Sequence, residues 1–393
     1  MTEYTALEAL LEDTKDSESP VRFKLWAYLF VIGAITKRSI YYRLKGILKL
    51  YPNLYVMLIA DSGFGKQFPI TMATKLLRTL NITRNIIGQS SIQGIIDPLL
   101  SKVITLENGV IIRNAEGAVI SSEFSNMLVT DLQALTLLTE LYDTEHLDIW
   151  EKNLVRGQVR LRNVFLSFLT GTNLEHYNDK VQEKDIRGGF IARTLCIHET
   201  EIGALNSLME EGPDIDWEKH CGRLREISKL AGPMSMSRDA KQLYDNWYYS
   251  FYKDPPVDKT GWVRRAREHV IKVAMCLSLI DRDDLIITKE HIADSMDFCF
   301  KVMKDVDNIA KKSGKSKYRS QYAIITMELI KAPGHMMKRQ RLLNKHLGEF
   351  TWKEFAETIE TLVQGGYVEN EDIDGEAGIK LTAKHIEELE SKQ

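Results

Sequence analysis

Runs of consecutive apolar residues recur in the first half of the chain, and segments with helical spacing of apolar positions lie between them. Runs of this kind predict strands buried on both faces, because a strand with one solvated face alternates apolar and polar residues. The clearest runs are 55–60, 117–121, 164–169 and 194–197. Helices are expected at 70–80 and 132–142, between these strands, and an alternation of strands and helices predicts an α/β fold.

The second half of the chain has mainly helical periodicity. Long helices are predicted over 217–230, 238–252, 260–281 and 289–311, and a boundary follows at the basic run 311–317. Three short helices and two short strands joined by an acidic loop come last, which is the pattern of a winged helix. We expect a helical collar at 1–50, a core at 51–200, a helical lid at 201–312 and a winged-helix domain at 313–393.

Composition limits the classes of partner. The net charge is -3 with 27% charged residues, so a contact with nucleic acid has to be local. The apolar run 23–35 is too short to cross a bilayer and predicts a buried helix, so no membrane partner is expected. The four cysteines lack C-x-x-C spacing, which favours reduced buried thiols and a cytoplasmic protein.

The most specific chemistry lies in the glycine-rich turn between strand 55–60 and helix 70–80. Gly63 and Gly65 allow backbone N–H groups to turn inward around a phosphate, and the helix N-terminus and Lys66 add positive charge. Strand, glycine loop and helix are the context that a phosphate-binding loop requires. The predicted nucleotide contacts in this loop are Ser62, Gly63, Phe64, Gly65, Lys66 and Gln67.

The loop departs from the usual G-x-x-x-x-G-K-[ST] pattern at two positions. Ala60 stands in place of the first glycine, and Gln67 stands in place of the hydroxyl residue that normally holds magnesium. These changes weaken the prediction of catalysis more than the prediction of binding. An ordinary glycine-rich turn between a strand and a helix is the alternative.

Two further strand ends carry polar residues that fit a nucleotide site. Strand 117–121 runs into Ser122 and Glu123, which resembles a Walker B element in which Glu123 polarises the attacking water. Ser122 occupies the position where such elements normally have an aspartate. Asn173 follows strand 164–169 and is placed to contact a nucleotide or its water. A surface glutamate is the alternative for Glu123.

Basic residues gather in two other places. Segment 147–162 alternates apolar and basic residues, which is typical of a hairpin. Its basic residues are expected to contact the phosphate backbone of a nucleic acid, and a charged face exposed to solvent is the alternative. Arg193 follows a glycine bend and could act on a neighbouring subunit's nucleotide, or pair with a surface acid. The predicted DNA contacts in the hairpin are Lys152, Arg156, Arg160 and Arg162.

The order of these motifs, together with Arg264 and Arg265 at the start of the third long helix, resembles a known family. It is similar to the phage and prophage replication ATPases catalogued mainly as a domain of unknown function. That family is distantly similar to superfamily 3 and minichromosome-maintenance helicases. The resemblance covers roughly residues 50 to 310 and depends on motif order more than on one strong motif.

The resemblance implies a P-loop NTPase core of the RecA or AAA+ type that binds ATP and Mg²⁺. It implies a catalytic role for Glu123, a sensor role for Asn173 and a finger role for Arg193. Arg264 or Arg265 would sense the γ-phosphate from the lid. Magnesium would lie near Gln67, Ser122 and Glu123.

The function that follows is an ATP-dependent DNA helicase or translocase of a phage or mobile element, located in the host cell cytoplasm. It would form a homo-oligomeric ring, expected to be a hexamer, around single-stranded DNA and work with other replication proteins. The departures at Gln67 and Ser122 leave a weakly hydrolysing helicase loader or initiator scaffold as an alternative. A winged-helix regulator is a third reading, although its groove-facing helix is acidic.

Overall fold

The computed structural model divides the chain into two compact units, 1–310 and 311–393, which are described separately. The structure describes residues 4–44, 48–82, 85–87, 92–100, 103–106, 109–112, 114–124, 134–143, 149–154, 157–175, 177, 189–205, 214–313, 317–346 and 351–390.

A parallel five-stranded sheet lies at the centre of the first unit. Its strand order is β11-β3-β10-β7-β4, and each neighbouring pair is parallel. The chain is therefore a mixed α/β protein, as the apolar runs predict. The strands are β3 (Tyr55–Ile59), β4 (Asn85–Ile87), β7 (Glu116–Ser121), β10 (Phe165–Thr172) and β11 (Thr194–His198).

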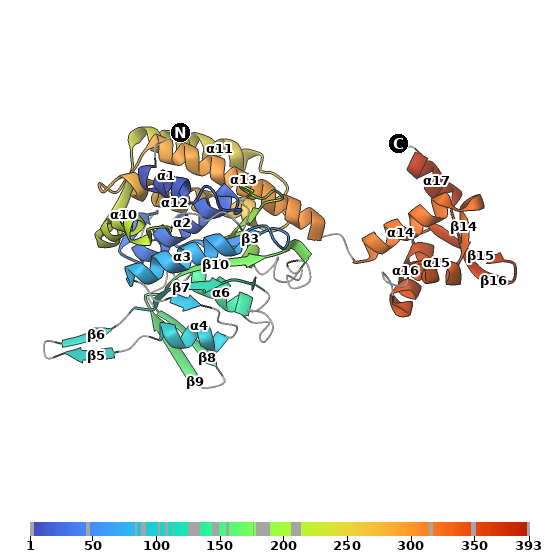
Figure 1. The fold of residues 1–393 in the computed structure, drawn as a ribbon, viewed down its shortest axis with the longest axis horizontal. Helices are drawn as coiled ribbons and strands as arrows, with labels where there is room; N and C mark the ends of the chain where they lie inside the picture. The colour runs from blue at the N-terminus through green and yellow to red at the C-terminus, as the bar shows by residue number, and fades with distance from the viewer. Residues whose placement is uncertain are drawn as a thin grey trace. The chain divides into compact units, whose positions relative to one another are not determined.

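Helices cover both faces of this sheet (Figure 1). Helices α2 (Val21–Thr36) and α3 (Gln67–Leu80) pack on one face, and α4 (Ile92–Leu99) and α6 (Ala134–Asp143) lie on the other. A further layer packs outside α2. It consists of α1 (Thr5–Asp13), α10 (Trp217–Lys229) and α12 (Trp262–Asp281).

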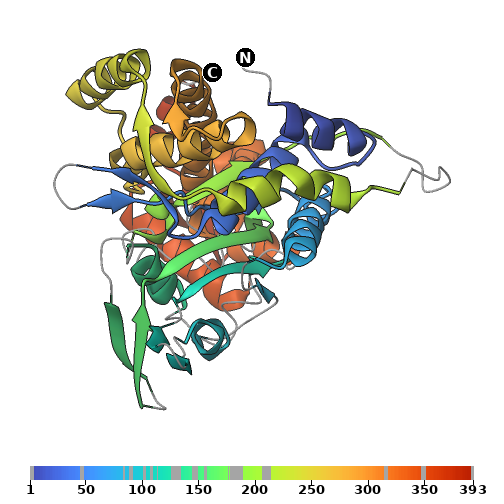
Figure 2. The same cartoon turned by 90° about the vertical axis from the view of Figure 1, so that its left-hand side faces the viewer.

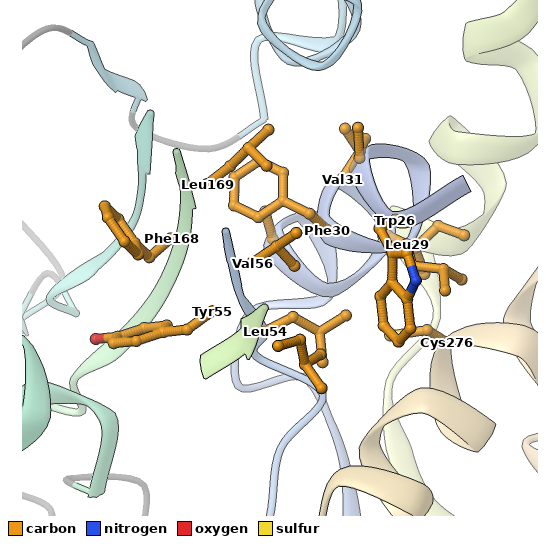
Figure 3. Packing of buried hydrophobic residues seen from close by; sticks show 14 of the residues in the cluster. Trp26, Leu29, Phe30, Val31, Leu54, Tyr55, Val56, Phe168, Leu169 and Cys276 are labelled. Atoms are coloured by element: carbon orange, nitrogen blue, oxygen red, sulfur yellow. The ribbon is translucent and has the colours of Figure 1, made fainter. Parts of the chain in front are cut away.

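Helix α2 is buried on all sides, as the apolar run 23–35 predicts. Its sequence has no polar face, so the helix can only be stable between other elements. Phe30 points toward strands β3 and β10, where Val56 and Leu169 lie, and Trp26 lies beside Cys276 of α12 (Figure 3). The helix therefore joins the sheet to the outer helical layer.

A second sheet joins the N-terminal segment to the helical region after residue 201. It has four strands in the order β13-β12-β1-β2, and β1 pairs with β12 in parallel. The sequence does not reveal these short strands, and the expected boundaries at 50 and 200 stay predictions. The strands are β1 (Ile40–Arg43), β2 (Lys49–Leu50), β12 (Gly232–Met236) and β13 (Ile286–Ile287), flanked by helices α11 (Arg238–Lys253) and α13 (Lys289–Ser313).

Two antiparallel hairpins project from the body of the first unit. One is formed by β5 (Val103–Leu106) and β6 (Gly109–Ile112), and the other by β8 (Ile149–Leu154) and β9 (Gly157–Arg162). Figure 2 shows the second hairpin, in green, extending away from the central sheet. The second hairpin confirms the prediction made from the alternating residues of segment 147–162.

The second unit combines helices with a small antiparallel sheet of order β14-β16-β15. The sequence predicts two strands in this region, and these are β15 and β16, but it does not predict a third strand, Met336–Lys338, which pairs with β16. The elements are α14 (Lys317–Lys331), η2 (Pro333–His335), β14 (Met336–Lys338), α15 (Arg339–Lys345), α16 (Trp352–Gln364), β15 (Val368–Ile373), β16 (Glu376–Leu381) and α17 (Ala383–Glu390).

Two expectations about burial and membranes can be compared with the structure. All four cysteines are buried free thiols, as predicted. Within the described part of the chain, no helix combines the length and apolar character needed to cross a membrane.

Two helical glycines give a matched test of how α2 packs. A Cβ atom at Gly33 would lie 2.4 Å from the carbonyl oxygen of Pro52, whereas one at Gly222 in α10 would meet nothing within 4 Å. We expect Gly33→Ala to lower the free energy of unfolding by about 1–3 kcal/mol through overpacking. Gly222→Ala should raise it by about 0.5–1 kcal/mol, because alanine loses less backbone entropy in a helix. Urea unfolding midpoints measure both, and equal stabilisation by the two variants would contradict the close contact at Gly33.

Candidate nucleotide-binding site

The polar residues predicted at three strand ends come together at the carboxyl edge of the central sheet. Strands β3, β7 and β10 are parallel neighbours, so the loops after them leave the sheet on the same side. The edge is tied together by backbone hydrogen bonds: Ala60 donates to the Thr172 carbonyl at 3.3 Å, and Glu199 donates to the Ile59 carbonyl at 3.0 Å. Ligands of parallel α/β sheets bind at this edge.

The glycine-rich turn has the backbone that a phosphate cradle needs. Gly63 and Gly65 have φ values of 86° and 65°, in the left-handed region that favours glycine. The turn leads directly into α3, a helix of 14 residues whose N-terminal N–H groups have no helical partners. Ser62 and Phe64 alternate with the two glycines in this turn. The turn therefore places the N-terminus of α3 at the carboxyl edge of the sheet, and within it the Phe64 and Phe68 amides donate to the Asp61 and Gly65 carbonyls at 3.4 and 3.3 Å.

The Lys66 ammonium lies within the turn rather than in solvent. It donates to the carbonyl oxygens of Ala60 and Asp61 at 2.6 and 2.7 Å. Burial lowers the pKa of Lys66, and the negative charges of Glu123 and Asp61 partly oppose this change. An anion at this position would replace the two carbonyl contacts and favour the charged ammonium.

Gly171 in β10 allows the three strand ends to approach closely. A Cβ atom there would lie 3.1 Å from the Ser122 carbonyl oxygen and 3.8 Å from the Lys66 Cβ. The structure therefore brings Lys66 and the Ser122–Glu123 strand end together. Asn173 follows the last residue of β10 at the same edge, and its carbonyl accepts a hydrogen bond from Tyr177 at 3.0 Å.

Gln67 and Ser122, the two departures from the usual motifs, line one cavity of about 300 Å³ between α3 and β7. The Gln67 amide nitrogen donates to the Thr71 hydroxyl at 3.2 Å, which directs the amide oxygen the other way. Thr71 was not predicted as a site residue, although it lies one helical turn after Gln67. The remaining lining residues are Ile70, Thr71, Thr74, Lys75, Arg78 and Ile120.

The donor set of this cavity can be compared with what magnesium prefers. Gln67 supplies an amide oxygen and Ser122 a hydroxyl to this cavity, and Glu123, which follows Ser122 in the sequence but does not line the cavity, carries a carboxylate. These are hard oxygen ligands, and magnesium bound with a nucleotide needs only one or two carboxylates because phosphates supply the rest. The residues present therefore fit a magnesium ion held largely by phosphate. Gln67, Ser122 and Glu123 would hold it.

Residues 14–20 pack over the phosphate loop, a contact that the sequence does not reveal. The Gly65 position is so close to this turn that a Cβ atom would lie 2.8 Å from the Ser19 Cα. The buried Lys24 ammonium holds the turn by donating to the Thr14 carbonyl at 2.7 Å and to the Ser17 hydroxyl at 3.1 Å. On its other side, Gly203 donates to the Glu18 carbonyl at 2.8 Å.

Arg193 lies at the opposite edge of the sheet from the phosphate loop. It ends the short helix α9 (Phe190–Arg193), and the next residue, Thr194, pairs with the first residue of β3. The five residues of β3 lie between this pairing level and the phosphate loop. At about 3.3 Å per residue, the strand separates Arg193 from the loop by roughly 16 Å. The Arg193 side chain pairs with Asp143. Arg193 therefore cannot reach the phosphate loop of its own chain.

Arg264 and Arg265 lie at the same edge as Arg193. They stand in the first turn of α12, whose Trp262 indole donates to the Thr194 carbonyl at 3.2 Å. His269 one turn later donates through Nε2 to the Ala192 carbonyl at 2.9 Å, and burial lowers its pKa to about 3, so the ring is neutral. These contacts fix the start of α12 beside α9, away from Lys66.

The hairpin predicted to contact DNA is only partly described. Arg160 is half exposed, and its Nε lies 2.8 Å from a carboxylate oxygen of Glu151 on the paired strand. The carbonyl of Arg162 accepts from Ala115 at 2.8 Å, which fixes the base of the hairpin at the amino end of β7. The Lys152 backbone belongs to β8, whereas Arg156 falls outside the described residues.

Comparison with known proteins adds no family assignment. No protein-family model matches the chain, and no curated protein matches its sequence.

The contact between residues 14–20 and the loop can be tested with two glycines of the same backbone type. Gly65→Ala and Gly63→Ala both place a side chain at positive φ, which costs about 1–2 kcal/mol. Only at Gly65 would the new Cβ also meet the Ser19 backbone. We expect Gly65→Ala to speed hydrogen exchange of the Gly203 amide, which donates to Glu18, while Gly63→Ala changes it little. Equal exchange in the two variants would contradict the contact.

Proposed function

We propose that this chain is an ATP-dependent DNA helicase or translocase that works as a ring and completes each nucleotide site between two copies of itself. The observation that carries the proposal is the division of predicted site residues between two edges of one parallel sheet. The phosphate loop, Glu123 and Asn173 lie at the carboxyl edge, and Arg193 lies at the amino edge.

The fold supports a P-loop NTPase core of the AAA+ type. The loop strand β3 is separated from β7, the strand that leads to Glu123, by β10, the strand that leads to Asn173. This order, with β11 on the far side of β3, is typical of AAA+-like cores. It puts the ends of β10 and β7 next to each other on one side of the loop strand, so that Asn173 and Glu123 can face the γ-phosphate that Lys66 binds.

Each residue then has a defined task. The loop N–H groups and Lys66 bind the β- and γ-phosphates, and Glu123 orients and polarises the attacking water. Asn173 contacts the γ-phosphate or that water. Arg193 of a neighbouring copy stabilises the charge that develops on the transferred phosphoryl group. Magnesium, when bound with the nucleotide, neutralises phosphate charge.

The β8–β9 hairpin is the proposed contact for single-stranded DNA. It projects from the amino edge of the sheet, the edge that carries Arg193 (Figure 2). The ion pair between Arg160 and Glu151 is exposed on both sides, and pairs of this kind contribute only about 0–1 kcal/mol. Arg160 can therefore exchange Glu151 for a DNA phosphate at little cost.

The second unit, which fits the winged-helix prediction, is less suited to bind DNA. Lys338 pairs with Glu376 at 3.0 Å, and Lys345 pairs with Glu328 at 2.5 Å. These internal pairs neutralise basic residues of α15 and β14, while α16 presents exposed Glu357 and Glu360. We propose that this unit contacts other replication proteins.

A weakly hydrolysing helicase loader or initiator scaffold is the second candidate function. It is favoured by one observation, the cavity that Gln67 and Ser122 share, because both positions normally supply the side chains that secure magnesium. This candidate keeps nucleotide binding and assembly but makes turnover slow.

Lys66→Ala tests the nucleotide site directly. Among the described residues, the Lys66 ammonium donates to two loop carbonyls, and Lys66 is not part of the buried apolar core, so we expect the variant to fold normally. Its ATP turnover, measured with and without single-stranded DNA, should fall on the order of 10²-fold or more. Lys241→Ala, on the exposed face of α11, is the control and should match the wild type. Undiminished ATP binding and turnover in Lys66→Ala would remove the proposal.

The paired substitution Gln67→Thr with Ser122→Asp tests the account of the two departures. Restoring a hydroxyl and a carboxylate in the shared cavity should secure magnesium, so we expect turnover at ordinary magnesium to rise about tenfold. Thr74→Val is the control, because Thr74 lines the same cavity but bonds the Ile70 carbonyl. ATP hydrolysis across a magnesium titration measures the effect. Fast wild-type turnover that the double variant lowers would show that the chain has a different and complete metal site.

A further inference from the structure

Three elements of the first unit meet at one carboxylate. Asp143 ends α6, Arg193 ends α9, and Arg265 lies in the first turn of α12. The Arg193 Nε donates to both Asp143 oxygens at 3.1 Å, and its Nη2 contacts Oδ2 as well. The Arg265 Nη2 lies 3.3 Å from Oδ1 of the same carboxylate.

The pairing of Arg193 with Asp143 uses one side of the guanidinium group. Nε and Nη2 face Asp143, and Nη1 donates to the Gly189 carbonyl at 2.8 Å. Among the described residues, one N–H on each terminal nitrogen is left without a partner. A side-on pair of this kind leaves the end of the guanidinium able to make a bidentate contact with phosphate.

The surroundings hold this arrangement in place. Gly189 has a φ of 83°, and a Cβ atom there would lie 2.4 Å from the Arg193 Nη1, so only glycine allows the contact. Tyr142, next to Asp143, is buried against the Tyr55 ring at a centroid distance of 4.9 Å. The Arg193 side chain is only 12% exposed and is therefore confined to few rotamers.

We propose that Asp143 is a positioning residue that orients Arg193 for a phosphate held by a second copy of the chain. This role rests on the proposed nucleotide site shared between copies. One carboxylate faces two guanidinium groups, and Glu268 pairs with Arg265 on its other side at 3.0 Å. The N–H groups of Arg193 that have no partner among the described residues can donate to the oxygens of such a phosphate.

Asp143 also connects these arginines to the hairpin. The helix that it ends is followed six residues later by β8, the first strand of the proposed DNA contact.

A double-mutant cycle tests the role of Asp143. We expect Arg193→Ala to lower the turnover number about 10³-fold and Asp143→Asn to lower it about 10²-fold, because small misplacements of a catalytic group have effects of this size. Nucleotide affinity should change less than twofold in Asp143→Asn. The combined variant should be no slower than Arg193→Ala alone, because Asp143 acts through Arg193. Asp143→Glu should recover part of the loss.

Asp284→Asn is the matched control. Asp284 has similar exposure, 41% against 39% for Asp143, and pairs with Arg282 at the other end of α12. Its turnover should equal the wild type. Thermal unfolding of each variant measures the fold. If Asp143→Asn unfolds early, Asp143→Ser takes its place, and wild-type turnover in that variant overturns the role.

The turnover of these variants distinguishes the proposed role of Asp143 from the proposed nucleotide site shared between copies. Normal turnover in Arg193→Ala would overturn both. Normal turnover in Asp143→Asn beside an impaired Arg193→Ala would overturn the role of Asp143 alone. Losses that multiply in the combined variant would also overturn it, since they would show that Asp143 acts independently of Arg193.

Discussion

The polarity of the parallel sheet is the constraint on which the account of this protein depends. All neighbouring strands of the central sheet run the same way, so the loops after them gather at one edge and the residues before them at the other. The length of β3 keeps Lys66 and Arg193 apart. A single chain can therefore bind phosphate at one edge and offer an arginine at the other, but it cannot bring both to one phosphate.

Helix α2 and the segments beside it pack against the sheet and the phosphate loop. The helix is buried between the sheet and the outer helices, and the residues just before it, 14–20, lie against Gly65 of the phosphate loop. Arg22 at its start pairs with Glu199 and Asp305, at 2.7 and 2.6 Å, which ties this turn to the end of β11 and to α13. The N-terminal region therefore forms part of the loop's surroundings.

The sequence predicts the central elements well because each carries a strong local signal. The apolar run before Gly63, the helix after Lys66 and the buried helix at 23–35 are all present in the structure. Strands β1 and β12 were missed, because two short segments nearly 200 positions apart show no local pattern that reveals their pairing. Asp143 was missed for a similar reason: its role comes from two arginines that are distant in sequence.

The sequence predicts roles for site residues that belong to known motifs, but it does not predict where those residues lie in the fold. Lys66 and the strand end at Ser122 are brought together, and the two positions that depart from the usual motifs, Gln67 and Ser122, line one cavity. Motif order did not reveal that α12 starts at the edge opposite the loop. That placement follows from the contacts of Trp262 and His269 with the segment around Arg193.

The central claim, that a nucleotide site is shared between copies, is tested most directly by mixing two inactive variants. Arg193→Ala lacks the proposed finger, and Glu123→Gln lacks the proposed catalytic carboxylate. In a mixed ring, the intact loop and Glu123 of one copy would face the intact Arg193 of the other. The account predicts that ATP turnover of the mixture exceeds that of either variant alone. No recovery at any mixing ratio, with mixed assemblies shown to form, would contradict it.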